Sequence, residues 1–139
     1  MTVRVLIADD SISIRALLRF HMERFGYKVV GEAANGAEAV ALFKSLRPDI
    51  VTLDVVMPND GGVDALTTLH LIKKEDPTVP ILVVSAVPFD RTRETFMEEG
   101  AFDYLIKPFN KFYLDETRRK LERAFPELRQ GLRARIRRV

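Results

Sequence analysis

The chain has 139 residues, of which 47% are hydrophobic, 30% are charged and none is cysteine. This length and balance suit one compact domain, and they exclude a disordered chain, a membrane-embedded chain, disulfides and cysteine-based nucleophiles or metal sites. The net charge of +2 conceals +7 in residues 118–139, where nine Arg or Lys stand against two Glu, and therefore −5 in residues 1–117.

The amino terminus predicts a buried strand followed by a helix. Residues 3–8 form an apolar run rich in β-branched side chains that ends at Asp9 and Asp10. This run is too short for a signal peptide or a membrane span, so we expect a cytoplasmic protein without a membrane span. Ser11 or Ser13 can cap the helix that follows. Its apolar residues recur at helical spacing: Ile14, Leu17, Leu18 and Met22.

The same alternation of strand and helix continues along the chain. Four more strands are predicted at residues 27–33, 50–53, 81–84 and 102–106. Helices are predicted between and after them, at residues 37–46, 63–75 and 91–98 and from about Asn110 onward. Five strands alternating with five helices predict an α/β fold, a doubly wound parallel sheet with helices on both faces.

A basic extension follows this predicted domain. Pro126 interrupts the fifth helix, so we place the domain at residues 1–125 and the extension at residues 126–139. The extension is predicted to be disordered, or helical with Leu128, Leu132 and Ile136 on one side. Its arginines only weakly suggest contact with nucleic acid or an anionic membrane, because no aromatic residues are interleaved with them. A solvated extension, or a helix leading to an output domain, is favoured.

Polar residues end four of the five predicted strands. Parallel strands gather their carboxyl ends at one edge of a sheet, where ligands bind in such folds. Three carboxylates brought together there repel one another unless a cation joins them, and Mg²⁺ prefers such oxygen ligands. An aspartate can also act as a nucleophile toward phosphorus, supported by an ammonium and a hydroxyl group. The residues concerned are Asp9, Asp10, Asp54, Ser85 and Lys107.

Short motifs surround these residues: Asp9-Asp10-Ser11, Asp54-Val55-Val56-Met57-Pro58, Gly62, Ser85-Ala86 and Tyr104-Leu105-Ile106-Lys107-Pro108-Phe109. In this order they resemble the receiver domain of two-component response regulators, over residues 3 to about 125. The resemblance implies a flavodoxin-like, chemotaxis-regulator-like fold with strand order 2-1-3-4-5. It also implies a signalling switch with Mg²⁺ as cofactor that is phosphorylated on an aspartate.

The resemblance also implies a role for each site residue. Asp54 would accept the phosphoryl group, with Ser85 and Lys107 binding its oxygens. Mg²⁺ would be held by the carboxylates of Asp9, Asp10 and Asp54 and by the backbone carbonyl of Val56. The Lys107–Pro108 bond would be cis.

The switch itself would couple Ser85 to Tyr104. Tyr104 would turn inward when Ser85 moves toward the phosphoryl group, and the fourth helix, fifth strand and fifth helix would then present an altered face. The alternative for Tyr104 is a half-buried strand aromatic whose hydroxyl remains in water.

The implied partners are a sensor histidine kinase and a downstream protein target or the chain's own output domain. Phosphorylation-dependent dimerisation stays open. The chain would be a switch and not an enzyme, and its alternative is a receiver module within a larger regulator with DNA-binding or enzymatic output.

A Mg²⁺-dependent phosphohydrolase would require a second acid or base and a lid, neither of which is visible. A flavodoxin-type electron carrier would require a hydroxyl-rich phosphate loop where this chain has two carboxylates.

One departure from the family predicts slow loss of the phosphoryl group. In this family, the positions two after the phosphoacceptor and two after the hydroxyl residue flank the approach of water. Here they are Val56 and Val87. Neither side chain can orient water or act as a base, so we predict slow self-dephosphorylation.

Overall fold

The computed structural model describes residues 2–58, 62–87 and 91–130. In these residues five strands alternate with five helices, as the sequence predicts. The strands are β1 (Arg4–Ala8), β2 (Lys28–Ala33), β3 (Ile50–Leu53), β4 (Ile81–Ser85) and β5 (Asp103–Ile106). The helices are α1 (Ile12–Arg24), α2 (Gly36–Leu46), α3 (Ala65–Glu75), α4 (Arg91–Glu98) and α5 (Lys111–Ala124), with a short 3₁₀ helix, η2, at Pro126–Gln130.

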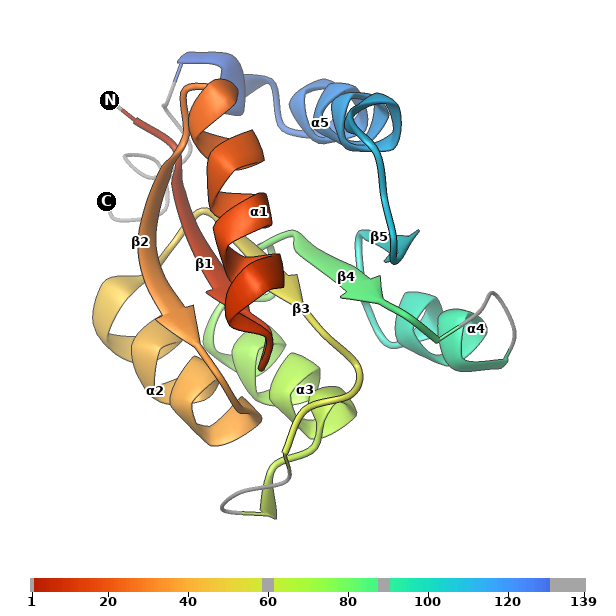
Figure 1. The fold of residues 1–139 in the computed structure, drawn as a ribbon. Helices are drawn as coiled ribbons and strands as arrows, with labels where there is room; N and C mark the ends of the chain where they lie inside the picture. The colour runs from red at the N-terminus through yellow and green to blue at the C-terminus, as the bar shows by residue number, and fades with distance from the viewer. Residues whose placement is uncertain (1, 59–61, 88–90, 131–139) are drawn as a thin grey trace.

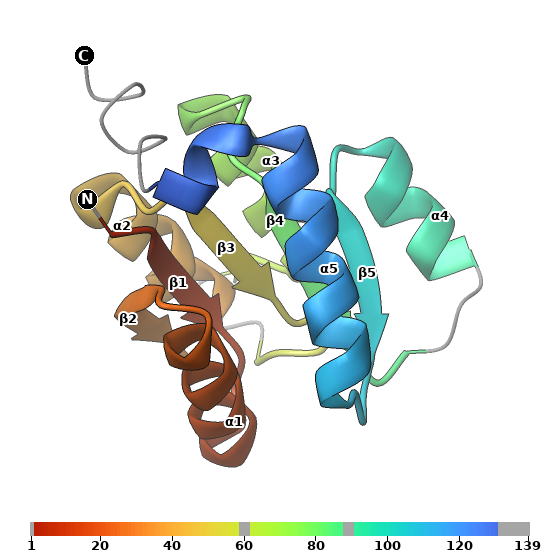
Figure 2. The same cartoon turned by 90° about the horizontal axis from the view of Figure 1, so that it is seen from above.

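The strands form one parallel sheet in the order β2-β1-β3-β4-β5, which confirms the predicted order. Helices α1 and α5 cover one face of the sheet, and α2, α3 and α4 cover the other (Figures 1 and 2). Successive residues of a strand point to opposite faces, so each strand contributes to two apolar layers. In β1, Leu6 packs toward the α2–α3 side and Ile7 toward α1. None of the helices in the described part of the chain is long and apolar enough to cross a bilayer.

Helix α1 begins at one of the two predicted caps, and most of its predicted apolar residues face the sheet. The side chain of Ser11 accepts a hydrogen bond from the backbone amide of Ile14, so Ser11 is the N-cap. Leu18 and Met22 are buried, whereas Leu17 is 41% exposed. Only part of the predicted apolar stripe therefore meets the sheet.

Polar and aromatic contacts fasten α1 to α5 on their shared face of the sheet. The guanidinium groups of Arg24 and Arg118 both lie over the ring of Phe25, at 5.0 and 4.8 Å from its centroid. Arg24 also pairs with Asp115 of α5 at 3.1 Å. These contacts hold α5, which follows the predicted site residue Lys107, against α1.

Helices α2 and α3 approach each other closely at Gly36. A Cβ atom at this position would lie 2.3 Å from the hydroxyl oxygen of Thr68 and 2.5 Å from the carbonyl oxygen of Val63. Both distances are shorter than two non-bonded atoms can approach, so the start of α2 fits here only because Gly36 has no side chain. Asp64, beside Val63, caps α3 by accepting a bond from the amide of Thr67.

The described chain ends in η2, which packs against the body of the domain. Leu128 is 2% exposed and belongs to the apolar cluster that contains Val3, Tyr27 and Leu121. The first residues of the predicted extension are thus part of the folded unit. The predicted helical positions Leu132 and Ile136 lie outside the described residues.

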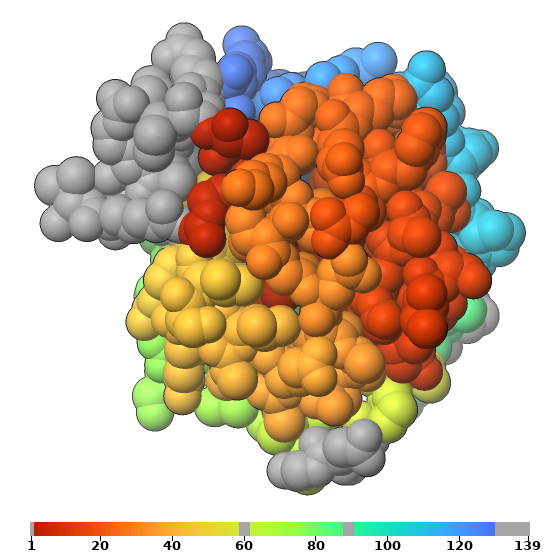
Figure 3. Space-filling model, turned by 60° about the vertical axis from the view of Figure 1, so that its left-hand side comes forward, coloured from red at the N-terminus to blue at the C-terminus, as the bar shows by residue number. Residues whose placement is uncertain are grey.

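Figure 3 shows the side of the molecule built mostly by the first third of the chain, in red to yellow, with α5 in blue at its edge.

Candidate functional site

Three of the predicted site residues bring their carboxylates together at the carboxyl edge of the sheet. Asp9 and Asp10 follow β1, and Asp54 follows the neighbouring strand β3. Oxygen atoms of the three carboxylates all lie within 4.8 Å of one another. Asp9 and Asp54 are buried, at 1% and 4% exposure, whereas Asp10 is exposed. The topology therefore creates the predicted acidic cluster.

Lys107, which follows β5, joins this cluster from the other side. Its ammonium nitrogen lies 2.6 Å from Oδ2 of Asp9 and 3.2 Å from Oδ2 of Asp54. Its backbone amide donates to the carbonyl of Ser85 at 2.8 Å, which places the ends of β4 and β5 together. The Lys107–Pro108 bond is cis, as expected.

The charged groups of the cluster shift the pKa values of Asp54 and Lys107. Burial raises the pKa of Asp54, and the charge of Asp9 raises it further, while Lys107 acts in the opposite direction. Burial on its own would lower the pKa of Lys107, but the hydrogen bond to Asp9 and the charges of Asp54 and Asp9 outweigh it, and that pKa is raised. Lys107 is thus held as an ammonium between the two buried carboxylates.

The donor set of this cluster fits Mg²⁺. Three carboxylates face a single ammonium among the described residues, so the cluster has an excess of negative charge. Carboxylate oxygens in this number are the ligands that Mg²⁺ accepts, together with water. The backbone amide of Val56 donates to Oδ1 of Asp54 at 3.2 Å, and the Val56 side chain is 62% exposed beside the cluster. The metal-binding role of the Val56 carbonyl stays a prediction.

Ser85 and Tyr104 meet at residue 87. The Ser85 hydroxyl oxygen accepts a hydrogen bond from the amide of Val87 at 3.2 Å, and the Tyr104 hydroxyl donates to the Val87 carbonyl at 2.8 Å. Both side chains are buried. The alternative of a Tyr104 hydroxyl that remains in water is therefore wrong for this structure. Tyr104 already lies inward in this structure, and the predicted coupling of its position to a movement of Ser85 stays a prediction.

A pocket of about 670 Å³ lies on the other side of Lys107, between α4, β5 and α5. This is the face that the resemblance implies for signalling. Lys107 lines the pocket, and its ammonium contacts the acidic cluster, so one residue borders both places. The residues lining the pocket are Arg93, Asp103, Tyr104, Leu105, Ile106, Lys107, Pro108, Tyr113, Glu116, Thr117 and Lys120.

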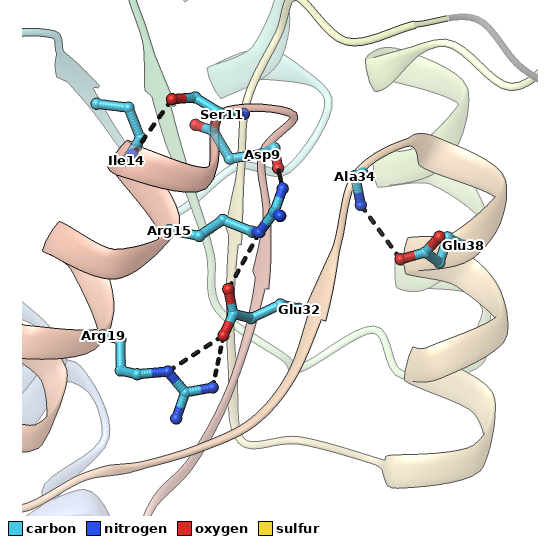
Figure 4. Close-up of polar contacts among 8 residues, drawn as sticks. All are labelled: Asp9, Ser11, Ile14, Arg15, Arg19, Glu32, Ala34 and Glu38. Carbon is cyan, nitrogen blue, oxygen red and sulfur yellow. Dashed lines mark hydrogen bonds and ion pairs between the residues drawn. The ribbon is translucent and has the colours of Figure 1, made fainter.

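The sequence reasoning missed a group of charged residues beside the cluster. Arg15 of α1 donates to the backbone carbonyl of Asp9 at 2.6 Å and to Glu32 of β2 at 3.1 Å, and Arg19 pairs with the same glutamate at 2.6 Å (Figure 4). The signal that could have revealed it is Glu32 itself, a single carboxylate within a strand that is otherwise uncharged apart from Lys28 at its start.

Comparisons with known proteins agree with this geometry. A family model described as the response regulator receiver domain matches residues 5–118. The chemotaxis protein CheY of Thermotoga maritima is 40% identical over 123 residues, which cover 88% of this chain and all of that protein. A protein-glutamate methylesterase/protein-glutamine glutaminase of Alkalilimnicola ehrlichii is 37% identical, over 88% of this chain but 32% of its own length.

Solved structures place the fold in the same group. The structure of a CheX–CheY–BeF3–Mg²⁺ complex from Borrelia burgdorferi matches with a TM-score of 0.78 and 28% identity, over 88% of this chain and 89% of that chain. The match of the family model over most of the chain and the identity with the Thermotoga protein over its full length lead to one conclusion. The chain belongs to the receiver-domain family of two-component response regulators.

Proposed function

We propose that the chain is a signalling switch in which Asp54 accepts a phosphoryl group from the phosphohistidine of a sensor histidine kinase. The observation that carries this proposal is the position of the Asp54 carboxylate, buried within 4.8 Å of two further carboxylates and bonded to Lys107. Such a group is poised for phosphoryl transfer, because this reaction needs alignment and neutralised charge more than covalent catalysis.

In the proposed step an oxygen of Asp54 attacks the phosphorus atom. A P–O bond forms, the bond from phosphorus to the donor nitrogen breaks, and the donor imidazole leaves with the electron pair. The Lys107 ammonium stabilises the negative charge on the phosphoryl oxygens, and the Ser85 hydroxyl can turn from Val87 to donate to one of them.

Mg²⁺ would be held by Asp9, Asp10 and Asp54, and when bound it supplies positive charge to the phosphoryl oxygens. Support comes from the donor set described above and from the Borrelia relative, whose structure is described as a complex with BeF3 and Mg²⁺. Without a cation, the excess negative charge of the cluster would oppose the approach of an anionic phosphoryl group.

We further propose that the signal leaves through the pocket of α4, β5 and α5, where a downstream protein binds. Lys107 touches both the cluster and the pocket, and Tyr104 is bonded to Val87, whose amide is bonded to Ser85. A phosphoryl group that binds Ser85 and Lys107 would thus disturb two sets of contacts that lead to this face. One is the bond between Ser85 and Val87, and the other is the contact of Lys107 with the acidic cluster. The proposed step is the same whether the receiver acts alone, as in the Thermotoga relative, or within a longer regulator.

The proposal is tested by treating the wild type, Asp54→Asn and Asp64→Asn with acetyl phosphate, with and without Mg²⁺, and measuring intact mass. Asp64 is the matched control, because it is an aspartate outside the cluster whose capping role asparagine retains. We expect one added phosphoryl group in the wild type and in Asp64→Asn, only with Mg²⁺, and none in Asp54→Asn. A modified Asp54→Asn protein, or an unmodified wild type, would contradict the proposal.

A further inference from the structure

The turn after β1 determines where two of the three carboxylates point. Its backbone begins with the amide of Asp9, which donates to the carbonyl of Ala33 at 2.9 Å. Oδ1 of Asp9 then accepts a bond from the amide of Ser11 at 2.9 Å, and Ser11 caps α1. The carbonyl of Asp9 is the remaining polar backbone group of this residue.

Arg15 contacts that carbonyl. Its terminal nitrogen Nη1 donates to the Asp9 carbonyl oxygen at 2.6 Å, while Nε donates to Oε1 of Glu32 at 3.1 Å. The side chain is 16% exposed, so water has little access to these bonds. Figure 4 shows the guanidinium between the turn and the glutamate of β2. Because the guanidinium is planar and rigid, binding both partners fixes its position.

Glu32 is itself held from a second side. Arg19 donates to Oε2 of Glu32 through Nε at 3.1 Å and through its terminal nitrogen Nη2 at 2.6 Å. The hydrogen bond from Arg19 is the main cause that lowers the pKa of Glu32, and Arg15 acts in the same direction. Because Arg15 and Arg19 bind different oxygens of Glu32, the bond from Arg15 does not depend on Arg19, and Glu32 stays a charged partner for Arg15.

We propose that Arg15 is a positioning residue for the metal-binding carboxylates, acting through the peptide bond that joins Asp9 to Asp10. This peptide is planar, so the direction of the Asp9 carbonyl also fixes the Cα atoms of both aspartates. Arg15 is itself bonded to Glu32, so it holds the Asp9 carbonyl oxygen in one place. In this way it restrains the backbone positions from which the side chains of Asp9 and Asp10 extend. The inference rests on the proposed role of Asp9 and Asp10 in holding Mg²⁺.

The charge of Arg15 would have the opposite effect on Mg²⁺. A guanidinium beside a cation site repels the cation, so removing the charge alone would strengthen Mg²⁺ binding. Loss of the bond from Arg15 to the Asp9 carbonyl would weaken Mg²⁺ binding, because carboxylates that can turn away must be ordered again when the ion binds. The sign of the change in affinity therefore separates the two effects.

The experiment measures Mg²⁺ affinity of the unphosphorylated protein by calorimetry and by backbone amide shifts in NMR spectra. Arg15→Gln removes both the charge and the guanidinium that binds two partners at once. Arg15→Lys keeps the charge, but an ammonium cannot bind the Asp9 carbonyl and Glu32 with the same geometry. Arg19→Gln is the matched control, since Arg19 pairs with the same glutamate from the same helix but has no bond to Asp9 among the described contacts. Urea unfolding of each variant confirms that the fold is intact.

We expect Arg15→Gln to weaken Mg²⁺ binding by about tenfold, the lower end of the range for residues that orient metal ligands. Arg15→Lys should also bind Mg²⁺ more weakly than the wild type, and Arg19→Gln should stay within about twofold of it. Unchanged or tighter binding in Arg15→Gln would overturn the inference, as would an equal loss in Arg19→Gln.

These outcomes differ from a failure of the proposed function. If the wild type does not bind Mg²⁺, or if Asp54→Asn binds it as well as the wild type does, the proposed site is wrong and the inference falls with it. If the wild type binds Mg²⁺ through Asp54 and Arg15→Gln binds it equally well, only the role of Arg15 is wrong.

Discussion

Replacing Asp54 with asparagine should stabilise the fold at neutral pH in the absence of Mg²⁺. The carboxylates of Asp9 and Asp10 lie within 4.8 Å of Asp54, and each repels it by about 3.5 kcal/mol at an effective dielectric constant of about 20. Lys107, at 3.2 Å, attracts it by about 5 kcal/mol on the same scale. Removing the charge thus removes slightly more repulsion than attraction. Screening reduces the repulsion by the exposed Asp10, but asparagine also removes the cost of burying the Asp54 charge, so we expect a net gain of about 1 to 2 kcal/mol.

The pH dependence of this gain follows from the raised pKa of Asp54, which burial causes first and the charge of Asp9 second. A folded state with a raised carboxyl pKa binds the proton more tightly than the unfolded chain does. Wild-type stability therefore falls as the pH rises from the unfolded pKa, about 3.9, through the folded pKa of Asp54, and stays lowered above it. The advantage of Asp54→Asn should be absent below this window and complete above it.

Urea unfolding followed by circular dichroism, in a chelator and over a series of pH values, measures this difference. Asp64→Asn is the control with the opposite sign, because the bond from the Thr67 amide lowers the pKa of Asp64 and favours its charged form. Its wild-type contribution is present above the unfolded pKa and is lost as the pH falls through the folded one. An Asp54→Asn protein less stable than the wild type at neutral pH would show that attraction to Lys107 dominates, and would refute the reasoning.

Three further changes test other parts of the structure. Leu128→Ala should destabilise the fold by about 2 to 4 kcal/mol, as for other buried leucines, and urea midpoints unchanged from the wild type would mean that η2 is not part of the folded unit. Tyr104→Phe removes the bond to the buried Val87 carbonyl and should cost about 1 to 3 kcal/mol by the same assay; a stability equal to the wild type would argue against that bond. Val56→Asn should speed loss of the phosphoryl group by about tenfold, less than the roughly 100-fold effect of a positioned acid or base, because an amide orients water without accepting its proton. Intact mass against time measures that rate, and a wild-type aspartyl phosphate lost within seconds would contradict the predicted slow hydrolysis.

The sheet and the acidic cluster could be predicted because both follow from short-range patterns. Apolar runs that end in Asp9, Asp54 and Lys107 define parallel strands, and parallel strands place their carboxyl ends together whatever the details of packing. The spatial order of the strands came only from the resemblance, since the alternation of elements does not determine it. The N-cap of α1 was predictable to within two residues, Ser11 or Ser13, because a cap bond spans only three residues, and the structure shows that it is Ser11.

Contacts that depend on how two elements are packed could not be predicted from the sequence. Arg15 reaches Glu32 only because α1 crosses β2 at that point, and helical spacing contains no information on that crossing. Similarly, Leu17 fits the apolar spacing of α1 but faces outward, because the tilt of the helix on the sheet selects Leu18 and Met22 instead. The partner of the Tyr104 hydroxyl is the carbonyl of Val87, which lies 17 residues away, just after β4, and therefore beyond any local pattern.

The tight contact at Gly36 has a consequence for how this sequence can change. The atoms that a side chain at this position would strike, the Thr68 hydroxyl and the Val63 carbonyl, belong to α3 and to the residues just before it. Any larger residue at position 36 must displace the start of α3 or the start of α2 itself, so the contact between these two helices restricts the sequence at this position. In a random library selected for a folded protein, position 36 should remain glycine, and a smaller residue at position 68 should not rescue a substitution there, because the Val63 carbonyl would still be struck.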